Sequence, residues 1–161
     1  MNICVMLVLG VANPTGEAQN YNGLYFKHDE LQQIADSKSF NGVPVKAEHR
    51  GNTLGTVVSS FLDTNGCLNC VLDIDESSVE GALAAGLVRD GIASELSLGY
   101  CVDVQHSEEG HKLEAGMKKI VEVSLVRKGA RDACYVLAFE DASGGTKYTR
   151  TLNAWKFFDM S

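Results

Sequence analysis

The sequence predicts a mainly β fold, a single-domain β-barrel with a few peripheral helices. Most apolar segments are short, rich in β-branched residues and bounded by turn residues, as in strands. The run Asp63–Gly66 ends in Asn-Gly between two such segments, which is a strong hairpin signal. Many antiparallel strands with few helices indicate a barrel or a strongly twisted sheet with helices packed outside. The 161 residues suit one domain with one core.

Seven strands are expected along the chain. They are Ile3–Val11, Val43–Ala47, Leu54–Leu62, Cys67–Ile74, Ile92–Val104, Lys119–Val126 and Ala133–Phe139. No basic residue precedes the first of these, and Gly10 and Pro14 limit the length of the apolar run. A signal peptide needs a charged start and a membrane helix needs about 20 apolar residues, so we expect a buried strand here.

Two helices are expected, over His28–Ser37 and over Ser77–Val88, the second capped by Ser77 or Ser78. Helical spacing places apolar residues on one face of each. These are Leu31, Ile34 and Ala35 in the first helix, and Val79, Leu83 and Leu87 in the second. Residues 1–140 are expected to form the main domain. Residues 141–161 would be a C-terminal appendage, with a third helix over Lys147–Phe158.

Composition and charge exclude several classes of function. Apolar residues make up 45% of the chain and charged residues 22%, which is a globular balance. A net charge of −7 makes nucleic acid and anionic membranes poor partners. The five scattered cysteines suit a reduced protein. Cys67 and Cys70 lack further ligands at suitable spacing and would point to opposite faces of a strand, so no metal is expected. The sequence also has no phosphate-loop or dinucleotide-binding motif, so no other cofactor is expected.

Among the four histidines, His49 has the most suggestive surroundings. It follows the extended run Val43–Glu48 and precedes Arg50-Gly51, so it lies at a strand end, where a rigid element can hold a side chain in place. Imidazole exchanges protons near neutral pH, so His49 is a candidate general base. The other three histidines lie at a helix start or in a polar segment and have ordinary explanations.

Two strand residues, Ser97 and Glu122, are the candidate nucleophile and the candidate acid for this base. Alternation places Glu95, Ser97 and Gly99 on one face of their strand, and Gly99 leaves room for close approach. A small polar residue such as Ser97 is more often structural, and spacing alone does not select it. Glu122 lies among β-branched residues, where a carboxylate needs a partner. It either orients the imidazole or faces solvent on an edge strand.

Three stretches together resemble a known family. They read VPVKAEHRGNTLGTV from Val43, LSLGY from Leu96, and EVSLV from Glu122, the last followed by Gly-Ala-Arg at 129–131. In order and spacing they are similar to the herpesvirus assemblin-type capsid maturation proteases and to the prohead proteases of tailed phages. Phage enzymes have Glu-Val-Ser-Leu-Val at the third stretch, whereas herpesvirus enzymes have a His followed by Gly-Arg-Arg. The resemblance covers residues 24–139.

The resemblance implies a serine endopeptidase with Ser97 as nucleophile, His49 as general base and Glu122 as the third member. It also implies an oxyanion hole from the Ala130 N–H and the Arg131 side chain. The substrate would be the scaffold protein inside an immature capsid, with self-cleavage, and the enzyme would be a homodimer. It would act in the host nucleus for a herpesvirus and in the cytoplasm for a phage.

Two alternatives remain open at the level of sequence. A catalytically inactive scaffold or capsid-interaction domain could retain the same fold. A cysteine hydrolase could instead use Cys101 or Cys134 with a histidine. Cys101 shares the Ser97 face but lies about 13 Å further along an extended strand. Reactivity of Ser97 distinguishes the protease from both alternatives.

Overall fold

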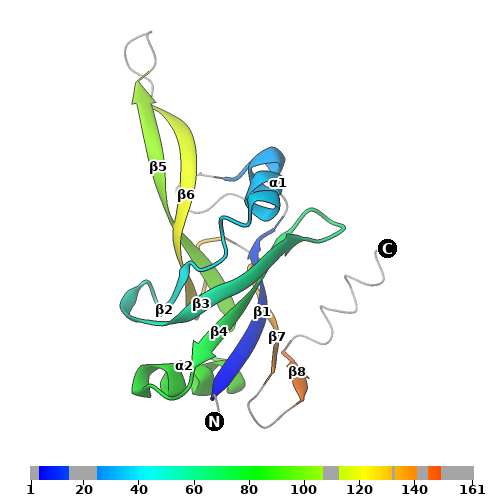
Figure 1. Cartoon of the computed structure of the whole chain (residues 1–161), viewed down its shortest axis with the longest axis vertical. Coiled ribbons are helices and arrows are strands. Elements are labelled where there is room, and N and C mark those ends of the chain that lie inside the picture. The colour runs from blue at the N-terminus through cyan, green and yellow to red at the C-terminus, as the bar shows by residue number, and fades with distance from the viewer. Residues whose placement is uncertain (1–3, 15–24, 107–112, 132, 141–144, 150–161) are drawn as a thin grey trace.

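The chain folds into eight strands and two helices, seen in a computed structural model that describes residues 4–14, 25–106, 113–131, 133–140 and 145–149 (Figure 1). The helices are α1 (His28–Ser37) and α2 (Val79–Arg89). The strands are β1 (Val5–Asn13), β2 (Pro44–Ala47), β3 (Arg50–Leu62), β4 (Leu68–Asp75), β5 (Glu95–His106), β6 (Leu113–Val126), β7 (Val136–Glu140) and β8 (Thr146–Tyr148). The prediction of a mainly β protein is confirmed.

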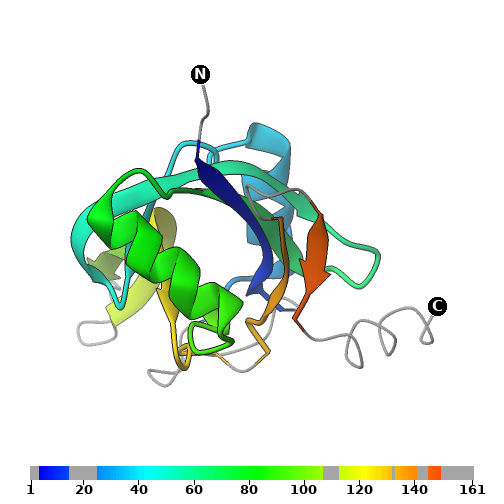
Figure 2. The ribbon, with the colours of Figure 1, turned by 90° about the horizontal axis from the view of Figure 1, so that it is seen from below.

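The strands form one mixed sheet in the order β5-β6-β2-β3-β4-β1-β7-β8. The β2–β6 pair is parallel, and the other neighbouring pairs are antiparallel. The closed barrel is not confirmed, because this order leaves β5 and β8 as the outer strands. The sheet is nevertheless strongly curved (Figure 2), and an isolated bridge joins Glu95 of β5 to Tyr135 just before β7.

Burial explains how β5 and β6 are oriented. Leu96 and Leu98 of β5 and Val123 and Leu125 of β6 are at most 7% exposed and belong to the main apolar cluster. Since side chains alternate along a strand, the intervening residues face the opposite side of the sheet. The largest fully buried side chains come from α1, from the segments that flank it and from strands. They include Phe26, Phe40, Met6, Leu31, Leu68, Leu72 and Ile74.

Helix α1 has the predicted bounds and the predicted inner face, with Leu31 fully buried and Ile34 and Ala35 packed against the core. It packs against β3 and is joined to β6 by an ion pair, whereas α2 lies at the opposite end of the molecule (Figure 1). Residues Glu30 of α1 and Lys118 of β6 form an ion pair at 3.0 Å between these two elements.

Helix α2 begins where predicted but buries a different face. The Ser78 hydroxyl caps it by accepting a hydrogen bond from the Gly81 N–H at 2.9 Å. The predicted face is wrong, because Val79 and Leu83 are 77% and 66% exposed and Leu87 is also exposed. The buried residues are small or β-branched: Gly81, Ala84, Ala85 and Val88. A β-carbon on Gly81 would overlap the Asp75 carbonyl, so the helix packs too closely for a face of leucines.

The C-terminal region differs from the expected helix. Lys147 lies in β8, which pairs with β7, and the Thr149 N–H extends this pairing to the Leu137 carbonyl at 3.1 Å. Thr and Tyr favour strands, which accounts for the difference. The remainder of the predicted helix, residues 150–161, lies outside the described residues. No helix in the described part of the chain is long and apolar enough to cross a membrane.

Candidate active site

His49 lies in a tight turn between β2 and β3. Ala47 pairs with Arg50, so Glu48 and His49 form a two-residue loop, and their φ angles are 50° and 59°. Such hairpin turns need positive φ at both central positions and usually contain Asn or Gly. Two side chains larger than glycine therefore occupy a left-handed conformation that the isolated chain disfavours.

Contacts with β6 hold this turn in place. The Glu48 N–H donates to the Leu125 carbonyl at 3.1 Å, and the Glu48 carboxylate accepts a hydrogen bond from the Arg127 N–H at 3.0 Å. The His49 N–H donates to the Ser124 hydroxyl at 2.9 Å. The turn conformation is thus supported by a strand more than 70 residues away in sequence.

Ser97 and Glu122 come from the adjacent strands β5 and β6. In the register of this pair, Ser97 lies opposite Ser124 and Gly99 lies opposite Glu122, so all four residues share one face of the sheet. A β-carbon on Gly99 would overlap the Glu122 side chain. Gly99 therefore provides the space in which the Glu122 carboxylate lies.

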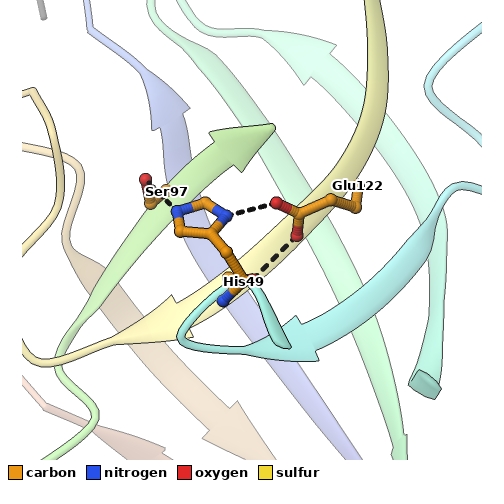
Figure 3. Close-up of polar contacts among 4 residues, drawn as sticks. His49, Ser97 and Glu122 are labelled. Carbon is orange, nitrogen blue, oxygen red and sulfur yellow. Dashed lines mark hydrogen bonds and ion pairs between the residues drawn. The ribbon is translucent and has the colours of Figure 1, made fainter. Parts of the chain in front are cut away.

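The structure brings His49, Ser97 and Glu122 into one hydrogen-bonded row (Figure 3). The Nε2 atom of His49 is 2.9 Å from the Ser97 hydroxyl, and its Nδ1 contacts Glu122 Oε1. An ionised carboxylate only accepts hydrogen bonds, so it selects the tautomer with the proton on Nδ1. That tautomer leaves the Nε2 lone pair free to accept the Ser97 proton.

Exposure differs sharply among these side chains. Ser97 is 6% exposed and Ser124 is 0% exposed, whereas the His49 side chain is 42% exposed. The Glu122 side chain is 12% exposed, and its second oxygen, Oε2, accepts a hydrogen bond from the Ser124 hydroxyl at 2.7 Å. The supporting groups are thus covered by protein, and the imidazole reaches the surface.

The predicted oxyanion residues lie beside β5. The Gly129 N–H donates to Glu95 Oε1 at 3.2 Å, and a β-carbon on Gly129 would lie 2.7 Å from the Leu96 carbonyl oxygen. This close approach places the segment 129–131 next to the strand that carries Ser97. Ala130 is partly buried within this segment.

Arg131 is 3% exposed, and its guanidinium faces aromatic rings. Its Nη2 donates to the Tyr100 hydroxyl at 3.1 Å, and its Cζ lies 5.3 Å from the Phe26 ring centre and 5.4 Å from that of Tyr100. These cation–π contacts hold the Arg131 end of the segment 129–131 in place. The oxyanion role of Ala130 and Arg131 remains a prediction.

The five cysteines are thiols rather than disulfides, and none belongs to the row of His49, Ser97 and Glu122. Cys101 is exposed, and Cys134 is buried with its thiol 3.5 Å from the Ala12 carbonyl. Burial raises the pKa of the Cys70 thiol, and Cys134 raises it further, so Cys70 stays protonated. Within the described ranges, no three His, Cys, Asp or Glu side chains are grouped as metal ligands would be.

Sequence reasoning did not identify Ser124 as part of the site. It is one of five buried polar or charged residues in the described chain, with Asn13, Asn69, Ser97 and Arg131. A signal was available, because Ser124 follows Glu122 by two positions and therefore shares its face of the strand. Its bond to the His49 backbone, however, depends on the fold.

Comparisons with known proteins give a similarity of fold. No family model and no curated protein matches the sequence. A solved structure of the protease of Kaposi's sarcoma-associated herpesvirus (KSHV), bound to a hexapeptide phosphonate inhibitor, has a TM-score of 0.50 at 17% identity. The match covers 83% of this chain and 64% of that one. The chain therefore shares a protease-like fold and spans less than two thirds of that protein.

A second KSHV protease structure, in complex with an allosteric inhibitor, is 21% identical with a TM-score of 0.47. That match covers 81% of this chain and 73% of the other. A third, in complex with a dimer disruptor, is 16% identical with a TM-score of 0.43, covering 81% and 74%.

Proposed function

We propose that this protein is a serine endopeptidase in which Ser97 is the nucleophile, His49 the general base and Glu122 the group that orients the base. The observation that carries the proposal is the 2.9 Å contact between His49 Nε2 and the Ser97 hydroxyl, with a carboxylate at the opposite ring nitrogen. A nucleophile, a base and an orienting acid within hydrogen-bond reach are the recognised geometry for acyl transfer.

The reaction follows from this arrangement. His49 Nε2 takes the Ser97 proton as Oγ attacks the peptide carbonyl, and the imidazolium then donates that proton to the leaving amine. Water hydrolyses the acyl-enzyme with His49 again acting as base. The Glu122 carboxylate stabilises the imidazolium through Nδ1–H. Charge on the tetrahedral oxygen would be met by the Ala130 N–H and by Arg131, and one such donor contributes about 3 kcal/mol.

The substrate is proposed from the sequence resemblance. The stretches at 43–57, 96–100 and 122–131 resemble enzymes that cleave the scaffold protein of an immature capsid, with self-cleavage. We propose the same substrate here, a homodimeric enzyme, and a location inside the capsid in the host nucleus or cytoplasm. Glu122 matches the phage pattern, whereas the shared fold is that of a herpesvirus protease.

The proposal is tested by peptide cleavage. The purified protein is incubated with its candidate scaffold protein and with an unbiased peptide mixture, and new termini are mapped by mass spectrometry. We expect internal cleavage at a few defined sites, abolished in Ser97→Ala. A folded protein that leaves both substrates intact would instead support an inactive capsid-interaction domain.

A further inference from the structure

Ser124 links two parts of the site that come from different elements. Its hydroxyl hydrogen is donated to Glu122 Oε2 at 2.7 Å, and its oxygen accepts the His49 backbone N–H at 2.9 Å. Together with the contact between His49 Nδ1 and Glu122 Oε1, these bonds close a ring of three residues. Both carboxylate oxygens of Glu122 are therefore occupied.

The two contacts of Ser124 restrict different motions. The bond to Oε2 fixes rotation of the Glu122 carboxylate, so that Oε1 remains aimed at Nδ1. The bond to the His49 N–H fixes the backbone of a residue with a φ of 59°, a conformation that local sequence does not favour. Ser124 is 0% exposed, so water does not replace the hydroxyl without a rearrangement of β5 and β6.

We propose that Ser124 is a positioning residue that holds His49 and Glu122 in the geometry needed to activate Ser97. The inference rests on the proposed serine hydrolase function. Ser124 lies opposite Ser97 in the β5–β6 register, but its proton is directed to Glu122 and it acts through the other two residues. A hydroxyl serves here because one atom must both donate and accept a hydrogen bond.

The test compares Ser124→Ala with Ser60→Ala, a matched control. Ser60 also lies in a strand, and its buried hydroxyl has no hydrogen-bond partner among the described residues. We expect Ser124→Ala to slow labelling of Ser97 by a fluorophosphonate about 10- to 100-fold, because small misplacements of catalytic groups have effects of this size. Ser60→Ala should label at the wild-type rate. Ser124→Thr, which keeps the hydroxyl, should recover most of the rate.

A second measurement does not depend on activity. NMR of protein labelled with ¹⁵N-histidine, assigned with His49→Ala, reports which ring nitrogen of His49 carries the proton. In the wild type we expect one tautomer with the proton on Nδ1, and in Ser124→Ala a mixture of tautomers. If the alanine variant does not fold, Ser124→Cys keeps the size of the side chain with a much weaker donor and carries the same expectations.

The outcomes separate the two proposals. Wild-type labelling rate and an unchanged His49 tautomer in folded Ser124→Ala would overturn the positioning role while leaving the protease intact. If the wild type is not labelled at Ser97, the proposed function fails, and the NMR comparison still decides whether Ser124 orders His49. In a Glu122→Gln background Ser124→Ala should cost less than in the wild type, because one of its two contacts is already altered, whereas fully additive losses would contradict action through Glu122.

Discussion

The two turns that flank β3 are stabilised in different ways, one by its own residues and one by contacts with β6. The turn into β4 contains Asn65 and Gly66, and Gly66 has a φ of 82° that glycine adopts without cost. Asp63 Oδ1 accepts the N–H groups of Asn65 and Cys67 at 2.9 and 3.0 Å, so this turn is stabilised locally. The turn before β3 contains Glu48 and His49 at positive φ and depends on β6.

This difference in stabilisation indicates which of the two turns is expected to carry a functional residue. The Asn-Gly turn needs no other part of the molecule, and it could be read directly from the sequence. The Glu48–His49 turn is unfavourable alone and becomes stable when β6 is in place. Strained conformations that the surrounding structure enforces are found at functional sites, and here the strained residue is the proposed base.

The largest expected effect concerns Glu122, the side chain that orients the His49 ring. Glu122→Gln preserves size but replaces an acceptor with an amide that can donate to His49 Nδ1, so the ring is held in the wrong tautomer. We expect labelling of Ser97 to slow by about 10³- to 10⁴-fold, as for other triad acids. The urea midpoint should change little. A loss below tenfold would mean that Glu122 does not orient the base.

Gly99→Ala tests the space that Gly99 leaves for Glu122. The added methyl would overlap the Glu122 side chain and move its carboxylate away from His49. We expect Ser97 labelling to fall about 100-fold, the cost of a misplacement near 1 Å. Ser60→Ala serves as the control. Unchanged labelling of a folded Gly99→Ala variant would show that the carboxylate position is not critical.

Asp63→Ala tests the local turn and should affect stability without affecting the site. It removes two backbone hydrogen bonds and the contact between Asp63 Oδ2 and Asn69 Nδ2 at 2.9 Å. The expected loss in the free energy of unfolding is about 1–3 kcal/mol, measured by urea denaturation. Labelling of Ser97 below the unfolding transition should stay at the wild-type rate. A slower reaction would show that the two turns are coupled, contrary to the expectation that the Asp63 turn is independent of the site.

The smallest effect is expected at Asp75, the last residue of β4. Hydrogen bonds from the Ser77 hydroxyl and then from its backbone N–H lower the pKa of Asp75 below the ordinary value of 3.8. A carboxyl whose folded pKa is lowered stabilises the fold above its unfolded pKa, and this contribution is lost as pH falls through the folded pKa. Asp75→Asn should therefore lower the urea midpoint slightly at neutral pH, and the difference should vanish in acid.

The sequence predicted those features that depend on local chemistry. The bounds of α1 follow from the spacing of Leu31, Ile34 and Ala35, and the β3–β4 hairpin follows from its turn residues. The inner face of α2 could not be predicted, because close contact with the chain near Asp75 selects Gly81 and small residues over leucine. Strand β8 depends on pairing with β7, a distant partner.

In the candidate site, too, some features could be predicted from the sequence and others depend on tertiary contacts. The roles of His49, Ser97 and Glu122 were proposed from the resemblance of three stretches to a known family, and the fold brings these residues together. The contribution of Ser124 was missed because it requires the His49 backbone to lie over β6, which local sequence does not encode. Arg131 was expected near the oxyanion, and its packing against Tyr100 and Phe26 likewise emerges from tertiary contacts.

The central claim is that Ser97 is activated by His49, and fluorophosphonate labelling tests it most directly. The purified protein is reacted at high concentration and the adduct is mapped by peptide mass spectrometry. We predict one adduct, on Ser97, that is absent in Ser97→Ala and in His49→Ala and present in Ser60→Ala. A folded protein that forms no adduct on Ser97, or forms it equally in His49→Ala, would contradict the account.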